Sequence, residues 1–116
     1  MTVQKIIAQN YQLFSGDTAV FKVTVKNQAD QAQDITGATA LFTIARRPED
    51  TPVVQLTTGT GITIDDAVTG KVTITVPSTD TDPLHGAYRW ELQMTDAVGR
   101  VSTVAFGTVS FIIDAG

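Results

Sequence analysis

The sequence contains no cysteine, a single histidine and only two glutamates among its 116 residues. Without cysteine the chain has no disulfide framework, no thiolate zinc site and no thiol nucleophile. No apolar run approaches the ~20 residues that a membrane-spanning helix needs. The first ten residues hold one lysine with no long apolar stretch behind it, so we expect no secretory signal peptide.

Charge is also sparse and slightly acidic. The chain has 8 Lys+Arg against 12 Asp+Glu, a formal net charge of −4, and charged residues make up 17% of it. A negative surface of this kind is unsuited to nucleic acid or to an anionic membrane, and we expect neither as a partner. Hydrophobic residues reach 42%, too many for a disordered chain. At this length we expect one domain spanning residues 1–116.

The residues that are abundant favour β-structure. Threonine occurs 19 times, valine 13 times and isoleucine 9 times, and these β-branched side chains suit a pleated, half-buried surface better than a helix. Alternation of apolar and polar residues between turn signals predicts seven strands. They cover residues 18–27, 38–46, 53–56, 62–65, 71–76, 86–95 and 101–113.

Each longer strand has one apolar face that we expect to be buried. Its members are Phe21, Val23, Val25, Ala40, Phe42, Ile44, Val72, Ile74, Val76, Tyr88, Trp90, Leu92 and Met94. Trp90 should lie between the sheets. In the last strand the inward phase moves from Val104 and Phe106 to Val109, Phe111 and Ile113, which predicts a β-bulge beside Gly107.

Two of the connections have recognisable turn chemistry. Asp96-Ala-Val-Gly99 predicts a tight hairpin with Gly99 at positive φ. Residues 77–84 can hold one helical turn between two prolines, with Ser78 as its N-cap. Two facing sheets would bury every apolar face at once, so we predict an all-β, immunoglobulin-like antiparallel β-sandwich of about seven strands. A closed barrel is the alternative.

Residues 1–16 do not alternate strictly and allow two interpretations. Ile6 and Ile7 would point to opposite faces of an extended chain, and Tyr11 follows in the same segment. A sandwich buries one face of a strand, so one isoleucine would meet water or a neighbouring subunit. We therefore expect homo-oligomer contacts through residues 1–14, by addition of this arm to an open sheet edge. The alternative is an ordinary first strand of the same monomer.

Catalytic and metal-binding patterns are weak throughout. The only histidine, His85, lies in a loop, and no serine occupies a Gly-x-Ser-x-Gly elbow. The acidic pairs all fall in predicted turns, where aspartate satisfies backbone N–H groups. Asp80-x-Asp82 has the carboxylate spacing of a calcium loop but lacks its glycine and trailing glutamate. We predict that the chain is not an enzyme and has no cofactor, with calcium as the one alternative.

The loops are the remaining candidates for binding. Arg46-Arg47 is the only basic pair and could engage an acidic protein surface. The loops at 46–52 and 77–86 should lie at the ends of the sandwich, where Arg47, Asp82 and His85 are candidate contacts for a carbohydrate or a host receptor.

A longer pattern supports a particular family. The pattern includes Asp34-Ile-Thr-Gly-Ala-Thr-Ala-Leu-Phe-Thr-Ile-Ala-Arg-Arg47, which is preceded by Ser15-Gly-Asp-Thr18. It continues with Gly70-Lys-Val-Thr-Ile-Thr-Val76 and Gly86-Ala-Tyr-Arg-Trp-Glu-Leu92. This ordered series resembles small immunoglobulin-like virion proteins of tailed phages and prophages. It is similar to the N-terminal domain of the phage upper baseplate protein family. The match covers most of residues 15–113 and brings no catalytic residues with it.

The resemblance implies a virion structural protein that is made in the bacterial cytoplasm and contacts other virion proteins. A tail or baseplate accessory is preferred over a capsid decoration protein. The chain ends at Gly116, whereas baseplate members continue into further domains. A carbohydrate-binding or host-adhesion module is the alternative function.

Overall fold

Alternating side chains build each long strand with one buried row and one exposed row. A computed structural model describes residues 4–5, 7–8, 10–27, 29–47 and 49–113. The strands are β1 (Gln4–Lys5), β2 (Ile7–Ala8), β3 (Tyr11–Phe14), β4 (Ala19–Thr24), β5 (Lys26–Asn27), β6 (Thr39–Ala45), β7 (Val54–Thr58), β8 (Gly61–Asp66), β9 (Lys71–Val76), β10 (Gly86–Thr95) and β11 (Val101–Ile112). One helical turn, α1 (Ser78–Thr81), lies between β9 and β10.

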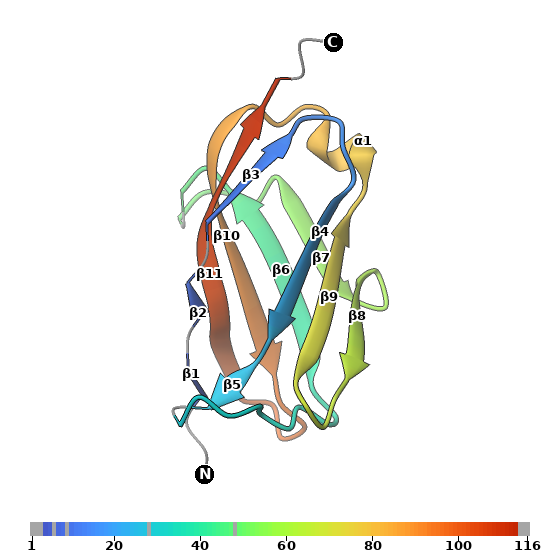
Figure 1. The fold of residues 1–116 in the computed structure, drawn as a ribbon, viewed down its shortest axis with the longest axis vertical. Coiled ribbons are helices and arrows are strands. Elements are labelled where there is room, and N and C mark those ends of the chain that lie inside the picture. Colours follow the sequence, from blue (N-terminus) through green and yellow to red (C-terminus); the bar gives the residue numbers. More distant parts are fainter. Residues whose placement is uncertain (1–3, 6, 9, 28, 48, 114–116) are drawn as a thin grey trace.

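The strands form two layers (Figure 1). The first layer runs in the order β2–β11–β10–β6–β7, with β3 also paired to β11, and the second runs β8–β9–β4. A short parallel pairing of Thr57 with Gly61 joins the layers at the β7–β8 corner. Where the chain first enters the sandwich, β1 pairs with β5 in the second layer, whereas β2 and β3 run parallel to β11 in the first.

This arrangement confirms the predicted immunoglobulin-like β-sandwich. The remaining pairs are antiparallel, including β10 with both β11 and β6. The predicted alternative, a closed barrel, needs a ladder between β3 and β4, and the pairings of the described strands include none. The sandwich nevertheless approaches a barrel because the β7–β8 pairing joins the two layers at one corner.

The core lies between the layers and is centred on Trp90, which is fully buried. Its ring lies 6.0 Å from that of Phe42 on the neighbouring strand and 5.9 Å from that of Phe21 in the opposite layer. All thirteen side chains predicted to face inward on the strands at 18–27, 38–46, 71–76 and 86–95 are buried. Burial of this apolar surface is the main term that stabilises the fold.

The last strand departs from the prediction. The register of β10 with β11 shifts between Leu92 and Gln93, so the extra residue is Val104 and the bulge lies there rather than beside Gly107. Val104 and Ala105 are consequently both buried, and Phe106 turns to the outer face instead of the core. Ile113, which we also expected inside, is exposed.

The helical turn and the last hairpin both form where the sequence predicts them. Residues 78–81 form the predicted helical turn, but Pro77 occupies the N-cap position and Ser78 is the first helical residue. The predicted hairpin is confirmed: Gly99 has φ of 92° and its N–H donates to the carbonyl of Asp96 at 3.0 Å. Only glycine adopts this left-handed conformation without strain.

Candidate functional site

Three connecting segments meet at the end of the sandwich that carries α1. We call residues 15–18, 46–47 and 77–87 the apical cluster. Backbone and side-chain hydrogen bonds tie it together: Gly16 N–H donates to Thr81 Oγ1 at 3.1 Å, and Thr81 Oγ1 donates to the carbonyl of Asp17 at 2.6 Å. Among the residues that the structure describes, Thr81 is the one polar residue that is buried. Its hydroxyl joins α1 to the β3–β4 loop.

Arg46, although exposed, is held in place by contacts within the apical cluster. Its guanidinium lies 4.1 Å from the centroid of the Tyr88 ring. Nη2 donates to the carbonyl of His85 at 2.7 Å and Nη1 to that of Ala87 at 3.3 Å. The strand register brings this about, because Ala45 pairs with Arg89 and the residue after Ala45 therefore reaches Tyr88. Arg47, the second member of the basic pair, is exposed.

His85 and Ser15 approach each other in the same cluster. The Oγ of Ser15 lies 3.2 Å from Nδ1 of His85, and it donates its proton to the carbonyl of Leu84. A hydroxyl has one proton, so while Ser15 Oγ donates to Leu84 it can only accept in its contact with His85 Nδ1. A serine nucleophile needs the opposite arrangement, with the imidazole accepting the hydroxyl proton.

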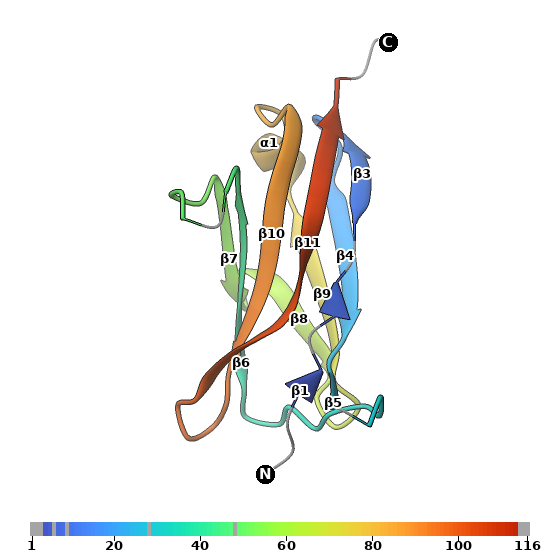
Figure 2. The same ribbon diagram turned by 90° about the vertical axis from the view of Figure 1, so that its left-hand side faces the viewer.

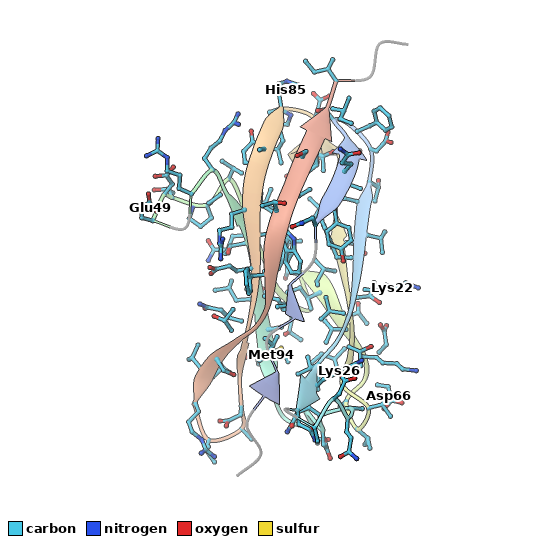
Figure 3. All side chains as sticks on the ribbon, turned by 60° about the vertical axis from the view of Figure 1, so that its left-hand side comes forward. Lys22, Lys26, Glu49, Asp66, His85 and Met94 are labelled. Carbon is cyan, nitrogen blue, oxygen red and sulfur yellow. The ribbon has the colours of Figure 1, made fainter. Side chains whose placement is uncertain are left out.

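The pair of Ser15 and His85 is not extended into a catalytic set. Among the described residues, no carboxylate forms a hydrogen bond or ion pair with the His85 ring. Asp82 lies beside Gly16 instead, where a Cβ added to the glycine would be 3.3 Å from Asp82 Oδ1. The pair therefore functions as a link between two loops. Figure 3 shows His85 at one end of the molecule, whereas Glu49 lies on a loop that projects from the side of the molecule.

Metal binding finds little support in the same region. In the part of the chain that the structure describes, no group of three or more His, Asp or Glu side chains could hold an ion. Asp80 and Asp82, the calcium alternative, are exposed residues in and just after α1. Within these described residues, no helix is long and apolar enough to span a bilayer.

The titratable groups with shifted pKa values stabilise turns or the core. The Thr36 hydroxyl and backbone N–H, which donate to Asp34 Oδ1, lower the pKa of that carboxyl. The backbone N–H of Arg100 lowers the pKa of Asp96 in the same way, helped by that of Val98. Burial raises the pKa of Tyr11. Each of these three groups belongs to its own turn or packing contact rather than to a shared site.

The N-terminal segment is paired within the monomer where it is described. Tyr11 packs edge-on against Phe21, with ring centroids 4.7 Å apart, so β3 contributes to the core. Ile7 pairs with Ala105 through the backbone, and Ile6 lies outside the described residues. This pairing is what the first-strand interpretation predicts, while the intersubunit contacts expected through residues 1–14 stay a prediction.

Sequence reasoning missed one surface. On the outer side of the first layer, the side chains of Thr43, Ala45, Asp50, Pro52, Arg89 and Glu91 line a small hollow. Phe106 lies on the other side of Arg89, whose guanidinium is 4.8 Å from the ring centroid. The alternation of β10 correctly predicts that Arg89 and Glu91 point outward. Because the sequence predicts the bulge beside Gly107, it assigns Phe106 to the core, and this outer surface cannot be recognised from the sequence.

The fold and these surfaces define an immunoglobulin-like β-sandwich module. No protein-family model and no curated protein matches the chain. Among solved structures, it is similar to the Ig1 domain of mouse SynCAM 2, with 15% identity and a TM-score of 0.38 over 97% of this chain and 99% of that one. Murine CRIg has 9% identity and a TM-score of 0.37, covering 98% and 97%.

A bacterial protein is among the similar structures as well. AggA, the major subunit of aggregative adherence fimbriae type I from Escherichia coli, has 11% identity and a TM-score of 0.35, covering 91% of each chain.

Proposed function

We propose that this chain is a non-catalytic structural protein of a tailed-phage or prophage virion, a tail or baseplate accessory that acts through protein–protein contacts. The observation that carries the proposal is the ordered resemblance of residues 15–113 to small immunoglobulin-like virion proteins. A β-sandwich is the fold that this resemblance implies.

The chemistry of the apical cluster supports a non-catalytic role. Ser15 gives its hydroxyl proton to a backbone carbonyl, and Arg46 directs its guanidinium to two carbonyls and the Tyr88 ring. These polar groups hold loops in place, which suits a rigid assembly module.

Two observations test the virion role. The genes on either side should encode tail, baseplate or head proteins, and flanking metabolic genes would remove the support of the resemblance. Immunogold electron microscopy of purified particles should place the chain on the tail or baseplate. Label confined to capsids would replace the tail assignment with a decoration role, and unlabelled particles would refute the virion assignment.

The expected partners are other virion proteins and further copies of this chain, with residues 1–14 as one contact. Deleting residues 2–8 removes β1 and β2 but keeps Tyr11 of β3 in the core. If residues 1–14 form an intersubunit contact, this truncated chain stays folded and loses higher-order mass in light scattering. A folded truncation with unchanged mass contradicts that contact.

A second candidate, a carbohydrate-binding or host-adhesion module, is favoured by one feature. His85, Asp82 and Arg47 are all exposed, and each belongs to the apical cluster. Loops on a rigid sandwich are common binding sites. Glycan-array screening with a calcium titration tests this function, and absence of binding at millimolar sugar with or without calcium eliminates it.

A further inference from the structure

The outer face of the first layer is depleted of charge. The chain has 8 Lys+Arg and 12 Asp+Glu, yet β6, β10 and β11 together contain only two charged residues, Arg89 and Glu91. The strands β4, β8 and β9 of the second layer are shorter and contain Lys22, Asp65, Asp66 and Lys71. Depletion of charge with retention of aromatic residues and arginine is typical of the centre of a protein interface.

This face also retains apolar side chains. Leu41 of β6 and Phe106 of β11 both point outward and are half-buried by their neighbours. Through the strand register, Phe106 lies directly opposite Glu91 and Leu41 opposite Gln93. Apolar side chains therefore lie on both neighbouring strands, Phe106 directly beside Glu91 on β11 and Leu41 one outward position further along on β6.

Arg89 and Glu91 are poorly matched to each other within one chain. Nε of Arg89 is 3.9 Å from Oε1 of Glu91, too far for a hydrogen bond, and the side chains keep 36% and 31% of their surface exposed. Nε is itself buried without a hydrogen-bond partner among the described residues. Stacking on Phe106 holds the guanidinium in place. The exposed parts of both side chains are thus open to a better-placed partner.

The face is open and large enough for a stable contact. In Figure 2, β10 and β11 face the viewer with no other element in front of them. The molecule measures 48 × 24 × 23 Å, so a long side is larger than the ~800 Å² that each partner contributes to a standard interface. The hollow beside Arg89 gives the face relief into which a partner side chain can fit.

We propose that this outer face, formed by β6, β10 and β11, binds the same face of a second copy of the chain. A two-fold axis that lies between the two copies, perpendicular to β10 and directly above Trp90, places Arg89 of each copy opposite Glu91 of the other, because the two residues are equally spaced on either side of it. The face carries one charge of each sign at equal distance from this axis, so it is complementary to itself. Interfaces of this symmetry present the same patch from both subunits.

A second copy suits the surface better than a strongly charged partner. A basic or acidic protein would find one matching and one opposing charge here, and like charges brought together cost several kcal/mol. The inference is independent of the virion role, because self-association is measured on the purified chain alone. It also differs from the contact through residues 1–14, because it requires neither β1 nor β2.

Charge reversal tests the contact. Purified wild-type chain should show a mass about twice the 12.4 kDa of the monomer in analytical ultracentrifugation at high concentration. Arg89→Glu and Glu91→Arg should each raise the dimer dissociation constant by about 100-fold or more, because each puts like charges across the axis. An equimolar mixture of the two variants should recover the dimer, since each copy then meets the opposite charge.

A matched reversal on the other layer is the control. Lys22→Glu changes an exposed lysine of β4 and should leave the dissociation constant unchanged. Circular dichroism and Trp90 emission verify that every variant is folded. Wild-type chain that stays monomeric, single variants that dimerise as well as the wild type, or a mixture of folded variants that stays monomeric would each overturn the proposal.

Discussion

The guanidinium of Arg46 lies against the Tyr88 ring, 4.1 Å from its centroid. It also donates to the carbonyl of His85, which precedes Tyr88 by three residues. The Tyr88 hydroxyl in turn accepts from the backbone N–H of His85 at 3.3 Å. One arginine and one tyrosine therefore fix the last residues of the α1–β10 loop. Gly86, the first residue of β10, follows this loop with φ of 87°.

Replacing Arg46 should loosen this loop. We expect Arg46→Ala to lower the free energy of unfolding by about 1–2 kcal/mol, from the lost cation–π contact and the lost hydrogen bonds to carbonyls. Urea unfolding followed by Trp90 fluorescence measures the change. Arg47→Ala removes the neighbouring exposed charge and should change stability by less than about 0.5 kcal/mol. Equal effects of the two substitutions would contradict the assigned contact.

Trp90 should dominate the energetics of the core. It is fully buried and contacts the rings of Phe21, Phe42 and Tyr11. We expect Trp90→Ala to cost about 3–5 kcal/mol, as other large-to-small core changes do, and Trp90→Phe to cost less. The native protein should show blue-shifted emission. An emission maximum like that of free indole in water would show that the assigned face of β10 is wrong.

Gly70 should tolerate no side chain. It has φ of 70°, and a Cβ there would lie 2.6 Å from the carbonyl oxygen of Gln33 and 2.7 Å from that of Val25. Gly59 has φ of 86° but nothing within 4 Å of its Cβ position. We expect Gly70→Ala to cost about 2–4 kcal/mol and Gly59→Ala about 1 kcal/mol, since only the first adds a clash to the backbone strain. Similar urea midpoints for the two variants would argue against the packing of the 67–70 turn.

Acid should destabilise the fold partly through its turns. Hydrogen bonds lower the folded-state pKa of Asp34 and Asp96 below the value of about 3.9 for an unfolded chain. The stability that they contribute is therefore present above the unfolded pKa and is lost as the pH falls through the folded one.

The test compares urea midpoints between about pH 5 and about pH 2. The double variant Asp34→Asn and Asp96→Asn should lose less stability than the wild type over this range. Asp82→Asn controls for the loss of one carboxylate at the opposite end of the sandwich. A double variant with the full acid dependence of the wild type would show that other groups govern it.

Alternation along the chain is sufficient to predict the layers and the core. The residues that face inward on β4, β6, β9 and β10 can be identified because polar and apolar side chains alternate there without interruption. In β11 the run Val104-Ala-Phe106 is apolar throughout, so alternation does not show which of these residues face inward. The large ring of Phe106 makes the core its expected place. In the structure the small Ala105 occupies the interior, and the larger ring lies under Arg89.

The candidate surfaces can be predicted only in part. Arg46 and His85 each stand out in the sequence, but their contact depends on a register between β6 and β10 that spans some forty residues. The role of Ser15 and Thr81 depends on two loops meeting at one end, which local pattern does not encode. The sequence does not assign the N-terminal segment to arm or strand because β1 and β2 contribute only two residues each to their ladders.

Copy number in the particle is the most direct test of the proposal that this module is a structural part of a virion. Particles purified by density gradient and washed at high salt would be analysed by quantitative mass spectrometry, with the tail tube protein as the internal reference. A structural component should keep the same ratio to that reference in independent preparations and after every wash. A ratio that varies between preparations and falls toward zero with washing would contradict the proposal.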